Sequence, residues 1–201
     1  MRILRPFVLG VVSLVVISWL ASCTSVSRRE RDEVIDVSGN WNDTDSRQVS
    51  ETMIKDLLGQ IWVDKFEGFQ GRPPVIIVGS VRNNTAEHIN SATFINDLER
   101  ALINSNKFKV VAGAGDRPEL RDEVKQMQEN ARPETMKKLK QETGADFYML
   151  GQINDIVDKE GGKSVRYYQV ILELVQLETH EKKWMGKQDI KKYVKKSKFG
   201  F

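Results

Sequence analysis

Apolar residues recur at helical spacing in the segment that follows Trp41. The stripe that they form consists of Val49, Met53, Leu57, Ile61 and Trp62. A second segment, residues 91–104, repeats the pattern with Phe94, Leu98, Ala101 and Leu102. This spacing predicts an amphipathic helix in each segment. One of three polar residues should cap the first helix: Asp43, Asp45 or Ser46.

The second helix has the clearer start, and two further helices are expected after it. Asn90 should cap the second helix, with Ile89 and Phe94 at the hydrophobic-staple positions. Pro118 should open a third helix, whose apolar side consists of Leu120, Val124 and Met127. Pro133 should open a fourth, which runs through Met136 and Leu139 and which Gly144 can end in the left-handed conformation.

Segments typical of strands lie between and after these helices. Residues 75–81 form a continuous apolar run, as in a strand covered on both faces. Residues 108–112, 146–153, 165–177 and 183–193 follow. In the fourth of these five segments Tyr168, Val170, Leu172 and Leu174 alternate with Gln169 and Glu173. The order α-β-α-β-α-α-β-β-β predicts an α+β fold, with about four helices packed on a mixed, largely antiparallel sheet of about five strands.

The first 22 residues have the pattern of a lipoprotein signal peptide. Arg2 and Arg5 precede an uncharged apolar core, and the small residues Ala21 and Ser22 precede Cys23, the only cysteine. The apolar core has about fourteen residues, whereas a membrane-spanning helix needs roughly twenty, so a transmembrane anchor is the less favoured interpretation. We expect cleavage before Cys23 and lipid attachment to its thiolate.

The predicted organisation therefore has three parts: a signal peptide (1–22), a lipidated tether (23–38) and a globular domain (39–201). The tether is polar, mixes both charges and shows no apolar period, as in a flexible segment. At roughly 3.4 Å per residue it reaches at most about 50 Å.

The charge pattern gives no case for a nucleic-acid partner. The formal net charge of +3 includes Arg2 and Arg5, and without them 29 basic residues face 28 acidic ones. One local excess remains, because eight lysines lie between Lys182 and Lys198. They either protect the edge of a terminal strand or meet anionic lipid, an anionic cell-wall polymer or an acidic protein face, and the first interpretation is favoured.

The residues offer no recognisable catalytic or metal-binding constellation. His88 and His180 are the only histidines, and no nucleophile elbow, phosphate loop or H-E-x-x-H pair is present. Asp43 and Asp45 lie beside a helix start, where they serve more simply as caps. Trp41 and Trp184 are expected to be packing residues rather than a stacking platform. We therefore expect a non-enzyme with no cofactor, no metal and no small-molecule substrate.

Several short segments together resemble the LpoB family, the outer-membrane lipoprotein activators of penicillin-binding proteins. They are residues 39–47, residues 74–81 with Asn83 and Thr85, residues 107–111, residues 144–146 with Gly151, residues 167–169, residues 177–179 and Trp184. The resemblance covers about residues 39–193. It implies a fold similar to the periplasmic domain of curli-secretion channels and to the N-terminal domain of TolB.

The resemblance also implies a function and a place in the cell. The protein would be a non-catalytic lipoprotein of the outer membrane that faces the periplasm and binds and stimulates a peptidoglycan synthase. Thr24 agrees with outer-membrane placement, because an aspartate after the lipidated cysteine retains lipoproteins in the inner membrane. Known members carry a long proline-rich tether, whereas this tether has about fifteen residues and no proline. The alternative function is a subunit of an outer-membrane assembly or secretion complex related to the curli channel, and an enzyme acting on wall fragments is least favoured.

Three surfaces are candidates for the docking of a partner. The first is the turn after the first strand, where Arg82, Asn83, Asn84, Glu87 and His88 gather. The second is the basic end of the chain, represented by Lys191 and Lys192. The third is the exposed side of the sheet around Gln169 and Glu173.

Overall fold

The computed structural model describes residues 26–30, 33–137 and 140–195. The chain forms two compact units, one up to Val34 and one from Ile35 onward. In the described part of the first unit, Arg29 and Glu33 form an ion pair at 3.7 Å. The predicted signal peptide and Cys23 lie outside the described residues. The second unit holds all the helices and strands of the described residues.

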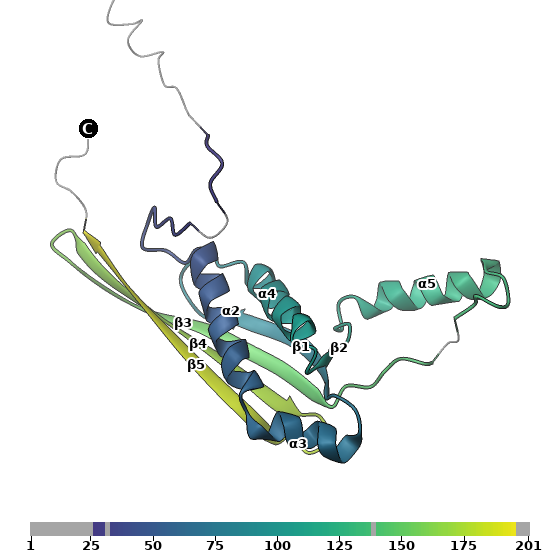
Figure 1. Ribbon diagram of the computed structural model, residues 1–201. Helices are drawn as coiled ribbons and strands as arrows, with labels where there is room; N and C mark the ends of the chain where they lie inside the picture. Colours follow the sequence, from purple (N-terminus) through teal and green to yellow (C-terminus); the bar gives the residue numbers. More distant parts are fainter. Residues whose placement is uncertain (1–25, 31–32, 138–139, 196–201) are drawn as a thin grey trace, which may run out of the picture. The chain divides into compact units, whose positions relative to one another are not determined.

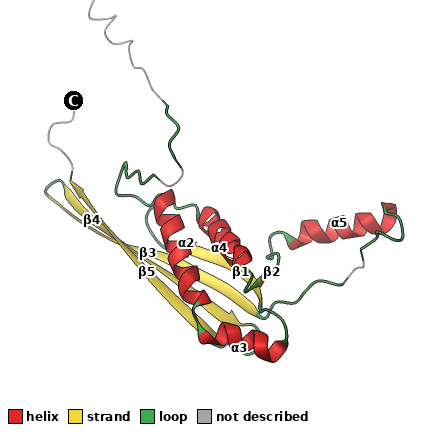
Figure 2. Ribbon diagram, viewed as in Figure 1, coloured by secondary structure: helices red, strands yellow, loops and turns green. Residues whose placement is uncertain are grey.

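The second unit combines helices with one mixed sheet (Figures 1 and 2). In the described residues the helices are α2 (Asp43–Leu58), α3 (Ile61–Gln70), α4 (Ser91–Asn104) and α5 (Arg117–Asn130). The strands are β1 (Val75–Asn83), β2 (Lys109–Val110), β3 (Phe147–Glu160), β4 (Lys163–Gln176) and β5 (Lys182–Lys195). Their order in the sheet is β2-β1-β3-β4-β5. β1 pairs in parallel with β2 and β3, and β3, β4 and β5 pair antiparallel, which confirms the predicted α+β fold.

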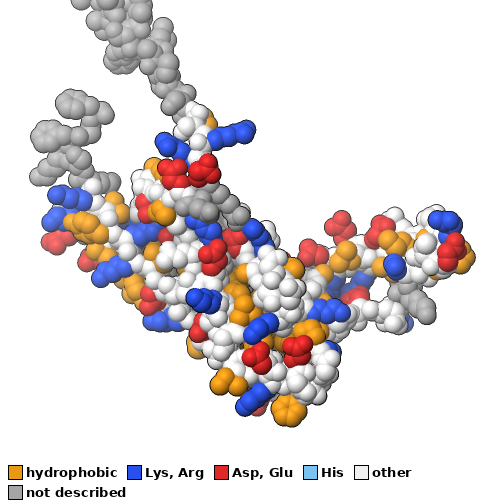
Figure 3. Space-filling view, in the orientation of Figure 1, with side chains coloured by type: hydrophobic (Ala, Val, Ile, Leu, Met, Phe, Trp, Pro, Cys, Tyr) orange, Lys and Arg blue, Asp and Glu red, His pale blue; other side chains and the backbone are white. Residues whose placement is uncertain are grey.

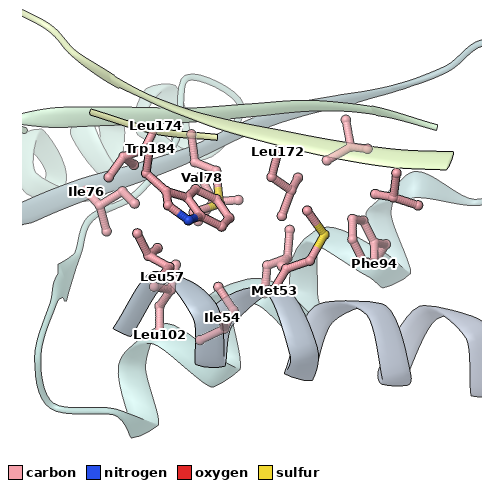
Figure 4. Close-up of a cluster of buried hydrophobic side chains, with 14 of the residues drawn as sticks. Met53, Ile54, Leu57, Ile76, Val78, Phe94, Leu102, Leu172, Leu174 and Trp184 are labelled. Carbon is pink, nitrogen blue, oxygen red and sulfur yellow. The ribbon is translucent and has the colours of Figure 1, made fainter. Parts of the chain in front are cut away.

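The core lies between one face of the sheet and the helices α2 and α4 (Figure 4). The helices contribute Val49, Met53, Leu57, Phe94, Leu98 and Leu102, and the sheet contributes Ile76, Val78, Phe147, Met149, Val170, Leu172 and Leu174. Trp184 is buried and Trp41 packs against the same cluster, edge to face with Phe94 and Tyr168. Both tryptophans are therefore packing residues, as expected. We call the sheet face that carries this core the inner face and the opposite one the outer face.

The caps of the two core helices follow the rules of helix ends. Asn90 caps α4, because its side chain accepts a hydrogen bond from the N–H of Ala92, as predicted. The cap of α2 is Asn42, one residue before the three that the sequence suggested. Asn42 and Asp45 form a capping box in which each side chain accepts from the other's backbone N–H, at 3.0 and 2.9 Å.

The first predicted helix is in fact two helices. α2 ends at Leu58, and Gln60 adopts an extended conformation before α3 begins at Ile61. The break turns α3 so that Trp62 packs against Phe108 and Phe147 of the core, and it leaves Ile61 exposed. The apolar period continues through the break, which is why the sequence pattern did not show it.

The predicted fourth helix is absent from the described residues. Residues 133–135 and Lys140 are in turns, and residues 136–137 and 141–144 are irregular, while Leu139 lies outside the described residues. Met136 and Leu139 are the only large apolar residues from Pro133 to Thr143, too few for an apolar stripe that packing could stabilise. The predicted number of helices is still found, because α2 and α3 replace one predicted helix.

The last three strands are longer than the sequence indicated, with 14 residues each. β3 and β4 pair along their full length up to a two-residue turn, Gly161-Gly162. Both glycines have positive φ, at 54° and 78°, which suits the tight turns that connect twisted strands. Figure 1 shows that the paired ends of these strands extend past the helices.

Candidate docking face

The structure divides the seven residues that the sequence suggested for docking into two groups. Arg82, Asn84, His88 and Lys191 are exposed. The side chains of Asn83, Glu87 and Lys192 point inward and take part in hydrogen bonds or ion pairs within the domain. Only the first group is therefore available to a partner.

Glu87 connects the turn after β1 to the inner face of the sheet. Its carboxylate forms an ion pair with Arg166 of β4, and it accepts hydrogen bonds from the hydroxyl of Tyr168 at 2.8 Å and from the N–H of Trp41 at 3.0 Å. Burial raises the pKa of Tyr168, so its hydroxyl stays protonated as a donor. The sequence suggested Glu87 as a contact residue, but in the structure its carboxylate is bonded within the domain, so its role is structural.

Lys192 closes the same end of the core from β5. Its ammonium lies 2.6 Å from the carboxylate of Asp45 and 2.8 Å from that of Asp36, and it donates to the carbonyl of Asn40 at 3.1 Å. Burial alone would lower the pKa of Lys192, but the hydrogen bonds to Asp36 and Asp45 outweigh it and raise the pKa. Lys192 is 11% exposed, so it holds the start of the domain in place and does not belong to a free basic surface.

Asn83 organises the turn itself. Its side-chain N–H donates to the carbonyl of Glu87 at 2.7 Å, and its oxygen accepts from the N–H and the hydroxyl of Thr85 at 3.0 and 2.7 Å. This is the Asx type of local bonding that favours asparagine in turns. The two positions that the family resemblance marked here, Asn83 and Thr85, are thus explained by turn geometry.

The outer face carries a continuous polar row that runs from the turn after β1 across the three strands β3, β4 and β5. Asn84, which follows β1, donates to the side chain of Asn154 on β3 at 2.9 Å. Asn154 pairs with Gln169 on β4, and Gln169 pairs with Asp189 on β5. Hydrogen bonding from Lys187 lowers the pKa of Asp189, with smaller contributions from Tyr167 and Gln169. Asn84 of the first docking candidate and Gln169 of the third therefore lie on one surface, on which β1 and β5 are about 14 Å apart.

Apolar and aromatic side chains flank this row on both sides. Toward one end of the strands lie Tyr148, Leu150, Ile171, Val175 and Met185, and toward the other lie Ile156, Tyr167 and Tyr193. Ile156, Tyr193 and Met185 are 67%, 62% and 57% exposed. Aromatic residues and methionine are enriched in protein interfaces, so the outer face can dock a protein.

Strand β5 forms one edge of the sheet and is lysine-rich, as the favoured interpretation required. Five of its lysines are exposed: Lys182, Lys183, Lys187, Lys191 and Lys195. The opposite edge is β2, which has two residues. A short edge and a charged edge both oppose the addition of another strand.

Inward and outward side chains alternate along β5, and this pattern could have shown from the sequence that Lys191 is exposed and Lys192 points inward. Trp184, Gly186, Gln188 and Ile190 share the inner face, and Lys192 is in phase with them. Lys191 is in phase with the exposed Met185 and Lys187 instead. No comparable local signal marks Arg166 or Asp36, which the sequence reasoning missed, because their partners lie far away in the chain.

The described residues contain no group of three or more histidine, cysteine, aspartate or glutamate side chains placed to hold a metal ion. None of their helices has both the length and the apolar character needed to cross a bilayer.

Comparison with known proteins gives a family and several distant structures. The model of the family "Peptidoglycan-synthase activator LpoB" matches residues 45–190. The C-terminal domain of LpoB from Escherichia coli is 20% identical, with a TM-score of 0.42, over 73% of this chain and 98% of that one. Lipoprotein GNA1162 from Neisseria meningitidis is 19% identical, with a TM-score of 0.41, over 62% of this chain and 87% of that one. The PelC dodecamer of Paraburkholderia phytofirmans is 12% identical, with a TM-score of 0.36, over 61% of this chain and 74% of that one.

No curated protein matches the sequence. The family match begins within the first turn of α2 and ends within β5, so it includes the helices and all five strands described above. This chain belongs to the family of the peptidoglycan-synthase activator LpoB.

Proposed function

We propose that this protein is a lipid-anchored lipoprotein of the outer membrane that faces the periplasm and stimulates a peptidoglycan synthase of the penicillin-binding class. Membership of the activator family is the observation that carries the proposal. The pattern of residues 1–22 and Cys23 supports the anchor. The activator is not itself an enzyme, and its effect on the synthase comes from binding.

The outer face is the surface that we assign to the synthase. It presents Asn84, Gln169 and Asp189 between two apolar patches, and the exposed Arg82 and Lys191 lie on the same face. A polar row between apolar patches gives both hydrogen-bonding specificity and apolar contact area. The inward groups of Glu87 and Lys192 keep the nearby turn and the start of α2 fixed, so the face is presented as a preformed surface.

The position of the anchor limits where the synthase can be met. Eleven residues lie between Cys23 and Ile35, the first residue of the second unit, so the two positions are at most about 40 Å apart. The synthase must therefore approach the outer membrane within that reach plus the size of the domain.

A binding and activation assay tests this assignment. The full chain, held in phosphatidylcholine nanodiscs, is mixed with the bifunctional synthases of the same organism, and both the dissociation constant and the rate of glycan polymerisation are measured. Ile171→Glu on the outer face should weaken binding and activation at least tenfold, because it buries a charge in the interface. The matched control is Glu51→Gln on the exposed side of α2, which should behave like the wild type.

Two results would contradict the proposal. Unchanged activation by Ile171→Glu would place the docking surface elsewhere. Failure of every synthase to bind, together with recovery of a secretion channel from envelope extracts, would favour the alternative function.

A further inference from the structure

Helix α5 has an apolar side that nothing in the described structure buries. Leu120, Val124 and Met127 lie along one side of the helix, yet none of the residues of α5 is buried, and Leu120 is 52% exposed. Figure 1 shows α5 apart from α2 and α4, and Figure 3 shows hydrophobic side chains at its surface among charged ones. A helix of 14 residues is marginal in water without packing. Its amphipathic pattern therefore calls for a partner surface.

A groove runs beside this apolar side. It has a volume of about 780 Å³ and lies between α5 and the irregular segment that includes residues 140–143. Val111, Leu120 and Val124 supply its apolar surface. The hydrogen bond from Arg117 to the carbonyl of Ala112, at 2.9 Å, and the ion pair of Arg121 with Glu142, at 2.7 Å, connect its two walls.

The charges around the groove are strongly one-sided. Five cationic side chains line it: Arg117, Arg121, Lys125, Lys137 and Lys140. Among the described lining residues, Glu142 is the single acidic one. Glu119 and Glu123 of α5 do not line the groove, but Asp122 pairs with Lys125 at 2.7 Å, as Glu142 pairs with Arg121. Five cations against these two carboxylates leave an excess of three positive charges, which favours an anionic occupant that also has an apolar side.

The spacing of the cations distinguishes a peptide from a lipid. Arg117, Arg121 and Lys125 are four residues apart, so they follow one another along α5 at intervals of about 6 Å. A phospholipid concentrates its negative charge at one end, whereas an acidic helix with carboxylates four residues apart presents charge at the same interval. A second copy of α5 would offer three apolar residues, too few for the roughly 1,200 Å² that a stable interface buries.

We propose that this groove binds an acidic amphipathic helix of a partner protein. The apolar residues of that helix cover Leu120 and Val124, and its carboxylates meet the cations of the groove. This is the helix-in-groove mode of recognition, with α5 as one wall. The site is separate from the outer face and does not depend on the synthase as partner.

A designed peptide pair tests the proposal. The probe is a synthetic helical peptide with leucines at positions i, i+3, i+4 and i+7 and glutamates four residues apart beside them, and the control peptide has glutamine at those acidic positions. The full chain is held in phosphatidylcholine nanodiscs. The acidic peptide should bind at least tenfold more tightly than the control at low salt, and the difference should shrink in 0.5 M salt. Binding should slow the amide hydrogen exchange of α5.

Variants on the two walls locate the binding site. Lys125→Glu on α5 and Lys137→Glu on the opposite wall should each lower the affinity for the acidic peptide at least fivefold. Glu119→Gln, at an exposed position of α5 that does not line the groove, is the matched control and should leave the affinity for the acidic peptide unchanged. The hydrogen exchange of α4 reports in each variant that the core is still folded.

Four outcomes would overturn the proposal. The first two are equal affinity of the protein for the two peptides and unchanged affinity of both wall variants for the acidic peptide. The third is slower amide hydrogen exchange of α5 in phosphatidylglycerol nanodiscs without any peptide. The fourth is amide hydrogen exchange of α5 that slows as the protein concentration rises, again without peptide. The third outcome would assign the groove to a lipid and the fourth to a second copy of this chain.

Discussion

The ammonium of Lys192 lies 2.6 Å from the carboxylate of Asp45, so the last strand of the sheet is connected directly to the first turn of the first core helix. Lys192 and Asp45 are 11% and 8% exposed. Asp45 also takes part in the capping box of α2, so one carboxylate serves both the helix end and the closure of the core.

Replacement of Lys192 by methionine should destabilise the domain. It leaves Asp45 buried without its cationic partner, and loss of one partner of a buried ion pair costs about 3 kcal/mol. Urea denaturation of the full chain measures the effect. The control is Lys191→Met at the neighbouring exposed position, which should change the free energy of unfolding by less than about 0.5 kcal/mol. Equal effects of the two variants would contradict the inward role of Lys192.

Stability should fall in acid partly through Asp146. Hydrogen bonding from Arg72, at 2.7 and 2.8 Å, lowers the pKa of Asp146 below its ordinary value of 3.8, and the N–H of Val75 adds to this. A carboxylate with a lowered folded pKa stabilises the fold above its unfolded pKa and loses that contribution as the pH falls through the folded pKa. Asp146→Asn should therefore be less stable than wild type at pH 7, and its stability should fall less steeply below pH 4. Thermal melts at several pH values compare the two, and parallel curves would contradict the prediction.

Gly151→Ala should destabilise the domain by about 1–3 kcal/mol, because overpacking forces neighbours to move. A Cβ at Gly151 would lie 2.5 Å from Cδ2 of Leu172 and 2.8 Å from the carbonyl oxygen of Ile171, and the latter belongs to the backbone of β4. Gly115 is the control, since a Cβ there meets nothing within 4 Å of it, so Gly115→Ala should be nearly neutral. Unfolding in urea measures both, and a neutral Gly151→Ala would show that β4 can move aside.

Replacement of Cys23 by serine should abolish lipid attachment. Serine offers no thiolate for acylation, so the precursor should keep residues 1–22 and take up no labelled fatty acid. Electrophoretic mobility and labelling of envelope fractions measure both. Normal processing and labelling of the variant would refute the lipoprotein assignment.

The parts of the fold that local residues determine were predictable from the sequence. The ends of α4 were predicted correctly because Asn90 supplies the cap and Phe94, Leu98 and Leu102 supply the stripe within one short segment. The turn at Gly161-Gly162 also depends on local residues, because few residues other than glycine tolerate two successive positive φ angles. The break between α2 and α3 was missed, since Trp62 continues the apolar period and its packing against Phe147 depends on the tertiary fold.

The site was less predictable than the fold, because side-chain direction in a strand depends on register. Asn83 and Asn84 are neighbours with the same chemistry, yet one organises the turn and the other reaches Asn154 on the outer face. The local sequence around Glu87 is that of an exposed turn. Arg166 and Tyr168 come to lie beside Glu87 only through the pairing of β1 with β3 and of β3 with β4. Long-range partners of this kind leave no trace in the local pattern.

The unequal edges of the sheet also govern how molecules of this protein behave toward one another in solution. The two-residue β2 offers little to an incoming strand, whereas β5 presents an edge of fourteen residues. Two β5 edges that approach each other bring their lysines together, and this repulsion acts over about 10 Å at 0.1 M salt but only about 3 Å at 1 M. Colloidal stability therefore decreases as the ionic strength rises, and the purified protein is best kept dispersed at low salt.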